Sequence, residues 1–424
     1  MKNIIFIFWI LKNYCLDIIE IPFESKKSEN YLPNRFLSQY YDINLYTKIE
    51  IGSNNQQLEL PIKLNKYITY ITSSALNNLK SLKFDEKKSS SYKKIDDNEF
   101  KSKDNDFISG YKSSDNIKIG NKNINKFKFY LSNNQIIDES GTLGLKVQPI
   151  SSDMKIVNDT GIIKQLKEEN LISSYYFYFK FDKSKNLGEY KGKLIIGGLP
   201  HEIESSKFDK SKFINTKIQK NIFNTTWDIY FMKINYGNDL VSEQISISFS
   251  STFGLIHAPI FFKKKIYEKF FYQENCYEEF NGYFNYFCCN EKVDIKQFKQ
   301  LYFESIYQEL NFTLNYEDLF YKIDKKNYFL ILFNNDIYTW QFGLNFLYRY
   351  TLVFNTDKKI IGYYFNQINK NENRKIIILY ILLIIFSIVI IFLITYIYYL
   401  LPLRKRKIKA NELDEEFDYT PKLI

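Results

Sequence analysis

Hydrophobic and polar residues alternate in short runs over most of the chain, and turn-forming residues separate the runs. No helical period persists for long between residues 30 and 368. Strand-like alternation occurs at residues 45–51, 116–131, 175–181, 193–198 and 227–234. Because the side chains of a strand point alternately to opposite faces, this pattern predicts a mostly antiparallel β protein. One amphipathic stretch, residues 160–172, instead predicts a short helix.

Two continuous apolar segments interrupt the alternation. Residues 4–11 follow Met1 and Lys2, an arrangement typical of a secretory signal peptide, which we expect to span about residues 1–20. The second segment, residues 376–401, contains no charged residue. As a helix it would be about 39 Å long, enough to cross a bilayer. We therefore expect one C-terminal transmembrane helix.

The charges beside this segment predict its orientation. A basic block, Arg404–Lys407, follows the apolar run directly, and Lys and Arg favour the cytoplasmic side of a membrane. Residues 402–424 are then a cytosolic tail, and the preceding domain is lumenal or extracellular. The sequence thus predicts a single-pass type I protein of the secretory pathway or the cell surface.

Composition narrows the class of protein further. Hydrophobic residues make up 45% of the chain and aromatic residues 18%, which excludes global disorder. The formal net charge is +10, a value that can indicate nucleic-acid binding. The lysines are nevertheless scattered, and the only dense block is the one beside the apolar run. We therefore expect a membrane partner and no nucleic acid.

Three cysteines, Cys276, Cys288 and Cys289, lie close together in the expected lumenal part. A zinc site needs four ligands, and the two histidines, His201 and His257, are distant in sequence. We expect no metal and no cofactor. In an oxidising compartment the simpler interpretation is a disulfide between Cys276 and either Cys288 or Cys289, which leaves one thiol.

Three sequons would be accessible to glycosylation in the same compartment. They are at Asn158, Asn224 and Asn311. Such triplets arise often by chance in an asparagine-rich chain, so each is a candidate site.

Eight segments, in order along the chain, resemble motifs of the pepsin-like aspartyl proteases. They are YTKIEIGSNNQQLELPI (46–62), FDEKKSSSYKKI (84–95), ISGYKSSDNIKIG (108–120), GTLGL (141–145), IIKQLKEENLISSYYFYFKF (162–181), GKLIIGG (192–198), TWDIYFMKI (226–234) and WQFGLNFLYRYTLVFNTDKKIIGYY (340–364). The resemblance covers almost the whole predicted lumenal part. It implies a bilobal acid-protease fold with β lobes at about 30–200 and 201–368 and a cleft between them.

The chemistry of that family requires two carboxylates that share a proton across the lobe interface, each in an Asp-Thr-Gly turn. Alignment with the motifs places Lys63 at the first aspartate position and Ser250 at the second. The tyrosine of the substrate-capping flap would fall near Lys103. The resemblance therefore predicts a family member that has lost its catalytic residues.

Other carboxylates do not restore the motif. Asp42 and Asp85 are the nearest before and after the first site, and neither is followed by Thr-Gly or Ser-Gly. The one Asp-Thr-Gly of the chain, residues 159–161, follows GTLGL where the family has a variable loop. A surface turn explains it better than a catalytic one.

Three functions remain open from the sequence. The first is a membrane-anchored pseudopeptidase that binds peptides, glycans or partner proteins in its cleft. The second is a peptidase of altered mechanism, for which a Ser250–Lys63 dyad is the conceivable form. The third is a surface glycoprotein that uses the fold as a scaffold, with bulky residues such as Tyr67 and Phe253 filling the cleft.

Overall fold

The structure is a computed structural model of the whole chain, and its described part falls into two units, residues 1–365 and 366–424. The described residues are 17–27, 37, 40–75, 82–101, 109–133, 139–147, 161–184, 186–219, 226–280, 282, 284–305, 311–334, 339–364, 370–396 and 404–406. The sequence predictions for residues 1–16, Lys103, Asn158 and Asn224 lie outside them, as do most of those for the tail.

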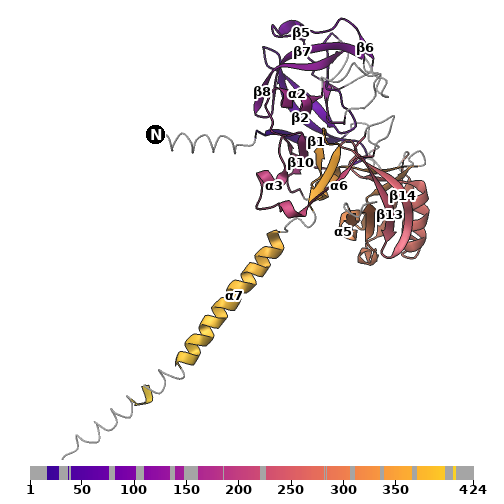
Figure 1. Cartoon of the computed structure of the whole chain (residues 1–424). Helices are drawn as coiled ribbons and strands as arrows, with labels where there is room; N and C mark the ends of the chain where they lie inside the picture. Colours follow the sequence, from indigo (N-terminus) through magenta and orange to yellow (C-terminus); the bar gives the residue numbers. More distant parts are fainter. Residues whose placement is uncertain are drawn as a thin grey trace, which may run out of the picture. The chain divides into compact units, whose positions relative to one another are not determined.

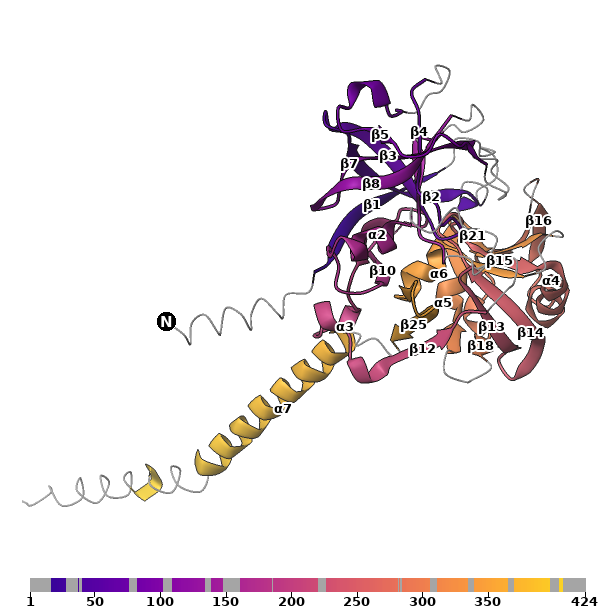
Figure 2. The same cartoon turned by 45° about the horizontal axis from the view of Figure 1, so that its top comes forward.

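Among the described residues, fourteen strands form one sheet, shown mainly in indigo to magenta in Figures 1 and 2. They are β1 (Ile19–Lys27), β2 (Ile43–Ile51), β3 (Gln56–Lys63), β4 (Tyr70–Thr72), β5 (Lys93–Lys94), β6 (Phe100–Lys101), β7 (Ser109–Ile119), β8 (Lys122–Ser132), β9 (Gly141–Gly144), β10 (Tyr176–Phe181), β11 (Lys191–Ile196), β12 (Phe213–Lys217), β24 (Val353–Asn355) and β25 (Ile360–Tyr364). The alternation of buried and exposed residues along β2 is the predicted one.

Eleven further described strands form a second sheet. They are β13 (Asp228–Tyr236), β14 (Asp239–Phe249), β15 (Ile256–Pro259), β16 (Tyr277–Phe280), β17 (Asn285–Asn290), β18 (Leu301–Ser305), β19 (Asn311–Leu314), β20 (Phe320–Ile323), β21 (Lys326–Phe329), β22 (Ile331–Asn334) and β23 (Trp340–Phe342). The prediction of a mostly β protein is confirmed.

Short helices cover the sheets. They are α2 (Ile162–Glu168), α3 (Pro200–Ile203), α4 (Ile260–Ile266), α5 (Tyr316–Leu319) and α6 (Leu344–Arg349). The helix α2 lies within the predicted stretch 160–172 and buries Ile163 and Leu166 against the first sheet.

The two sheets repeat one arrangement of strands. In the first sheet β3 is parallel to β9, β9 is antiparallel to β4, and β4 is parallel to β8. In the second sheet β14 is parallel to β23, β23 is antiparallel to β15, and β15 is parallel to β22. The two lobes are therefore structural repeats, although no internal repeat is evident in the sequence.

The two sheets do not divide the chain at residue 200, where the sequence predicts the boundary between the lobes. The strands β12, β24 and β25 follow that position but belong to the first sheet, where β24 pairs with β10. One continuous core joins the halves, and the fully buried Trp227 donates its indole N–H to the carbonyl oxygen of Leu145 at 3.0 Å. The lobes therefore fold against each other as one unit.

The first strand begins earlier than the expected domain. Ile19 and Ile21 of β1 are fully buried, and β1 pairs with both β11 and β2. The strand begins at Ile19, close to the predicted end of the signal peptide at about residue 20. The contacts of this segment begin at Asp17, whose carbonyl oxygen accepts the backbone N–H of Ser173.

The second unit contains one long helix, α7 (Lys370–Thr395), which starts before the predicted apolar run (Figure 2). Among the residues that the structure describes, no helix combines the length and apolar character needed to cross a membrane. Residues 397–401, the end of the predicted span, lie outside the described part.

Candidate functional site

The two loops predicted to bear the family's catalytic positions are equivalent in the strand repeat. Lys63 ends β3 and is paired with Gly144 of β9. Phe249 ends β14 and is paired with Phe342 of β23, so Ser250 lies opposite Gly343. Positions 63 and 250 therefore occupy the same place in each lobe, as the motif alignment predicts.

The hydroxyl of Ser251 joins these loops. It donates to the carbonyl oxygen of Ile62 at 2.8 Å and accepts the backbone N–H of Leu64 at 3.0 Å. Ser251 is fully buried. One side chain of the second lobe thus holds the backbone on both sides of Lys63.

Only the second loop contributes a side chain to the hydrogen bonds between the two loops described above. Leu64 occupies the position equivalent to Ser251, and its buried apolar side chain has no hydroxyl to return the two hydrogen bonds. In the family motif a threonine fixes each loop. Here a serine retains that role in the second loop, and the first loop has lost it.

Glycines allow other strands to pack closely beneath both loops. A Cβ added to Gly144 would lie 2.7 Å from the carbonyl oxygen of Lys66, and one added to Gly343 would lie 2.4 Å from that of Phe253. Such contacts are shorter than real Cβ contacts. Any larger residue at either position would displace a loop.

Lys63 is ion-paired. Its Nζ lies 2.9 Å and 3.1 Å from the two carboxylate oxygens of Glu139, and the side chains of Lys63 and Glu139 are 15% and 27% exposed. Thr72 donates its hydroxyl to the backbone carbonyl of Glu139 at 2.7 Å, which fixes the acidic residue in place. The position that aligns with the family's first aspartate therefore holds a lysine paired with a carboxylate that stands two residues before β9.

Asp42 adds a second carboxylate near this pair. Its backbone forms an isolated bridge with Phe253 of the second loop. Desolvation by the surrounding protein raises the pKa of Asp42, the Lys63 ammonium lowers it, and Glu139 raises it. The three charged groups are thus close enough to influence one another, with Lys63 as the common counter-ion.

Ser250 makes local hydrogen bonds. Its Oγ lies 2.9 Å from the hydroxyl of Thr252 and accepts the backbone N–H of Thr252 at 3.1 Å. Lys63 and Ser250 are therefore each engaged with other partners.

A buried histidine lies just beyond the second loop. His257 is fully buried, and neither ring nitrogen has a hydrogen-bond partner. Its ring contacts those of Phe253, Phe284 and Tyr41, with centroids 4.5, 5.2 and 5.3 Å away. Burial lowers the pKa of His257 to about 3, so the imidazole is neutral.

The other predicted site residues lie apart from the lobe junction. A disulfide joins Cys276 to Cys289, with Cα atoms 4.4 Å apart, and Cys288 is a buried free thiol, which settles which of the two expected pairings forms. Asn311 lies in β19 and its side-chain oxygen accepts the backbone N–H of Ser305. Among the described residues no cluster of three or more His, Cys, Asp or Glu side chains is arranged to hold a metal ion.

Of the other aspartates from the sequence analysis, Asp85 has a local role. Asp85 caps the 3-10 helix Glu86–Lys88 by accepting the backbone N–H of Lys87. Residues 159 and 160 of the Asp-Thr-Gly triplet lie outside the described part, and Gly161 is the N-cap of α2.

Sequence reasoning missed Glu139 and the link made by Ser251. Both could have been inferred from the motifs. Glu139 stands two residues before the GTLGL turn, which pairs with the strand that carries Lys63. Ser251 stands at the motif position whose threonine fixes the loop. The aromatic rings around His257 could not be predicted from the sequence, because Tyr41, Phe253 and Phe284 come from separate segments.

Comparison with protein families gives one match. The family described as "Eukaryotic aspartyl protease" matches residues 44–364, about three quarters of the chain. A search of curated proteins gives no match.

The first prediction concerns the Ser251 link. Ser251→Ala leaves the Leu64 N–H and the Ile62 carbonyl without partners in a site that water does not reach. We expect a loss of about 1–3 kcal/mol in the free energy of unfolding, measured by urea denaturation of a fragment spanning residues 17–365. The control Ser246→Ala lies in β14, just before this loop, and removes a hydroxyl bonded to exposed Gln219. It should change stability by less than about 0.5 kcal/mol. Equal effects of both substitutions would contradict the link.

The second prediction concerns pH. The folded pKa of His257, about 3, lies below its unfolded value of about 6.5. Between these values the unfolded chain binds a proton that the folded chain does not, so stability falls as the pH falls. His257→Leu removes this linkage. Between pH 7 and pH 4.5 the variant should lose roughly 2.5 kcal/mol less stability than the wild type.

The control for this pH effect is His201→Leu, because His201 is only partly buried and its Nδ1 contacts the Tyr364 hydroxyl at 2.6 Å. This variant should retain most of the wild-type pH dependence. Identical pH profiles for the wild type and His257→Leu would show that the buried imidazole does not cause the acid sensitivity.

Proposed function

Since the chain belongs to the eukaryotic aspartyl protease family, we propose that it is a membrane-anchored member without aspartic peptidase activity, which binds a peptide or protein segment at the junction of its lobes. The observation that carries this proposal is the ion pair of Lys63 with Glu139 at the first catalytic position. The second position, Ser250, adds a hydroxyl and no charge.

Aspartic peptidase chemistry depends on two carboxylates that share one proton. One carboxylate removes a proton from water while the other donates to the scissile carbonyl. An ammonium at the first position accepts no proton, and the serine at the second position does not ionise in this range. Asp42 and Glu139 are the carboxylates near this site, and both interact with Lys63. They therefore do not form a pair that shares one proton.

A Ser-Lys mechanism is also disfavoured. It needs the lysine as a neutral base within hydrogen-bond reach of the nucleophile. Lys63 donates to Glu139, and Ser250 is hydrogen-bonded to Thr252. A lysine nitrogen that donates to a carboxylate is not placed to take a proton from a serine hydroxyl.

Retention of the Ser251 link supports a binding role. The lobes remain joined at the former catalytic loops, and the junction presents two carboxylates and one ammonium. The backbone N–H groups and charged side chains of an extended peptide could bind to these carboxylates and to the ammonium. The scaffold alternative predicts no ligand at this junction.

Membrane attachment rests on the uncharged run 376–401 and on α7. Along α7 from Leu382 to Ile394, the large apolar side chains that the structure describes are 40–74% exposed. Exposure of so many adjacent apolar side chains to water is unfavourable, and a lipid environment removes that cost.

The third prediction tests catalysis. The purified protein should not cleave peptide or protein substrates between pH 2 and pH 8, with or without pepstatin. Lys63→Asp combined with Ser250→Asp should also be inactive. The new carboxylates would lie beside Glu139 and Asp42, and Leu64 cannot fix the first loop.

The matched control for this assay is Lys63→Ala with Ser250→Ala, and an active pepsin-like enzyme serves as positive control. Pepstatin-sensitive turnover by the wild type would refute the proposal. Pepstatin-resistant turnover that is lost in the alanine variant would instead favour the Ser-Lys mechanism.

The fourth prediction tests topology. The full-length chain with a C-terminal tag, made in sealed microsomes, should resist carbonate extraction. Added protease should remove the tag and leave a protected lumenal fragment that carries glycans. Protection of the tag would contradict the orientation, and extraction by carbonate would contradict the anchor.

A further inference from the structure

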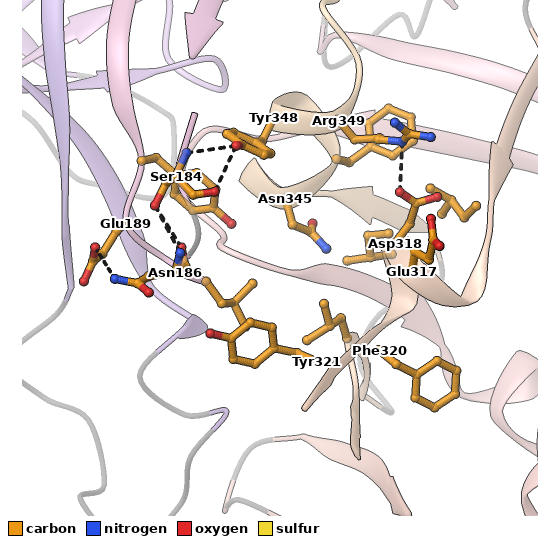
Figure 3. A pocket seen from close by; sticks show the side chains of 16 residues that line it. Ser184, Asn186, Glu189, Glu317, Asp318, Phe320, Tyr321, Asn345, Tyr348 and Arg349 are labelled. Atoms are coloured by element: carbon orange, nitrogen blue, oxygen red, sulfur yellow. Dashed lines mark hydrogen bonds and ion pairs between the residues drawn. The ribbon is translucent and has the colours of Figure 1, made fainter. Parts of the chain in front are cut away.

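A cavity of about 280 Å³ lies between the segment that connects β10 to β11 and the second-lobe elements α5, β20 and α6 (Figure 3). Neither Lys63 nor Ser250 lines it. Five of its sixteen lining residues are aromatic: Tyr190, Phe320, Tyr321, Phe346 and Tyr348. The volume suits one small organic group rather than an extended peptide.

Hydrogen bonds between the lobes close one side of the cavity. The hydroxyl of Tyr348 on α6 accepts the backbone N–H of Ser184 at 3.0 Å and lies 3.2 Å from the Ser184 carbonyl oxygen (Figure 3). On the same side Asn186 donates to Glu189 at 2.9 Å. A molecule in the cavity would therefore contact both halves of the unit.

The charged lining side chains are mainly acidic. Three of them are acidic, Glu189, Glu317 and Asp318, and one is basic, Arg349, whose Nε lies 2.9 Å from Asp318. This single ion pair leaves an excess of negative charge. Burial and the neighbouring Glu317 raise the pKa of Asp318, and Arg349 lowers it.

Asn345 supplies a polar group without a partner. It projects from α6 between the Tyr348 side and the Asp318 side of the cavity (Figure 3). Its side-chain oxygen is buried and receives no hydrogen bond. A buried acceptor in this state is unfavourable unless a donor reaches it.

We propose that this cavity is a binding site for a small organic cation with N–H donors, an alkylammonium or guanidinium group on a short apolar stem. The cation satisfies the acidic excess, its N–H group donates to the Asn345 oxygen, and its stem packs on the aromatic walls. Cations bind favourably over aromatic faces. An anion meets Glu317 and Asp318, and a neutral apolar molecule leaves Asn345 unsatisfied.

The test uses the full-length protein in detergent micelles and three fluorine-labelled probes of one shape, followed by fluorine NMR at pH 7. The probes are 4-fluorobenzylamine, 4-fluorobenzyl alcohol and 4-fluorobenzoate, and binding to empty micelles is subtracted. The amine should bind with a dissociation constant on the order of 1 mM, as its size allows. The alcohol and the benzoate should bind at least about tenfold more weakly.

Three variants assign the site. Asn345→Leu should weaken amine binding about tenfold, and Glu317→Gln should weaken it about three- to fivefold. Glu268→Gln removes an exposed carboxylate outside the cavity and should leave binding unchanged. If Asn345→Leu does not fold, the difference in amine affinity between Glu317→Gln and Glu268→Gln tests the site.

Equal affinity for the three probes would overturn the proposal. So would equal effects of Glu317→Gln and Glu268→Gln, or the absence of amine binding to the wild type. None of these outcomes depends on Lys63 or on peptidase activity, so this site and the function proposed above stand or fall separately.

Discussion

The Ser251 hydroxyl binds the backbone on both sides of Lys63, and the arrangement of the lobe junction depends on this contact. The two loops leave equivalent strands of a repeated sheet, and glycines beneath them allow close packing. A hydroxyl buried between a carbonyl and an N–H satisfies two backbone groups that water cannot reach. Selection for catalysis is not needed to keep such a contact, because stability alone preserves it.

Charge at the junction follows from that fixed geometry. With the loops in place, Lys63 lies beside Glu139 and within electrostatic reach of Asp42. Two carboxylates that face each other raise the pKa of one of them, which is useful to a peptidase. Here the Lys63 ammonium lowers the pKa of Asp42, although desolvation outweighs it and leaves that pKa raised. The buried, neutral His257 behind the second loop lowers the free energy of unfolding in acid, because only the unfolded chain takes up its proton there. The protein is therefore more stable at neutral pH.

Local patterns predicted much of the fold. Alternation identified strands such as β2 and β10, and the motif alignment placed Lys63 and Ser250 at positions that the strand repeat makes equivalent. The missing parts depend on contacts between distant segments. Glu139 is 76 residues from Lys63, and Tyr41 reaches His257 only in the folded lobes. The strand β1 escaped notice because its apolar residues adjoin the predicted signal peptide.

The ion pair of Lys63 with Glu139 occupies the position that aligns with the family's first aspartate. A double-mutant cycle with Lys63→Met, Glu139→Gln and the double variant measures this interaction directly, by urea unfolding at pH 7. Because both side chains are mostly buried, we predict a coupling free energy of about 1–2 kcal/mol. A coupling free energy near zero would mean that Lys63 points freely into the cleft, and would contradict the account.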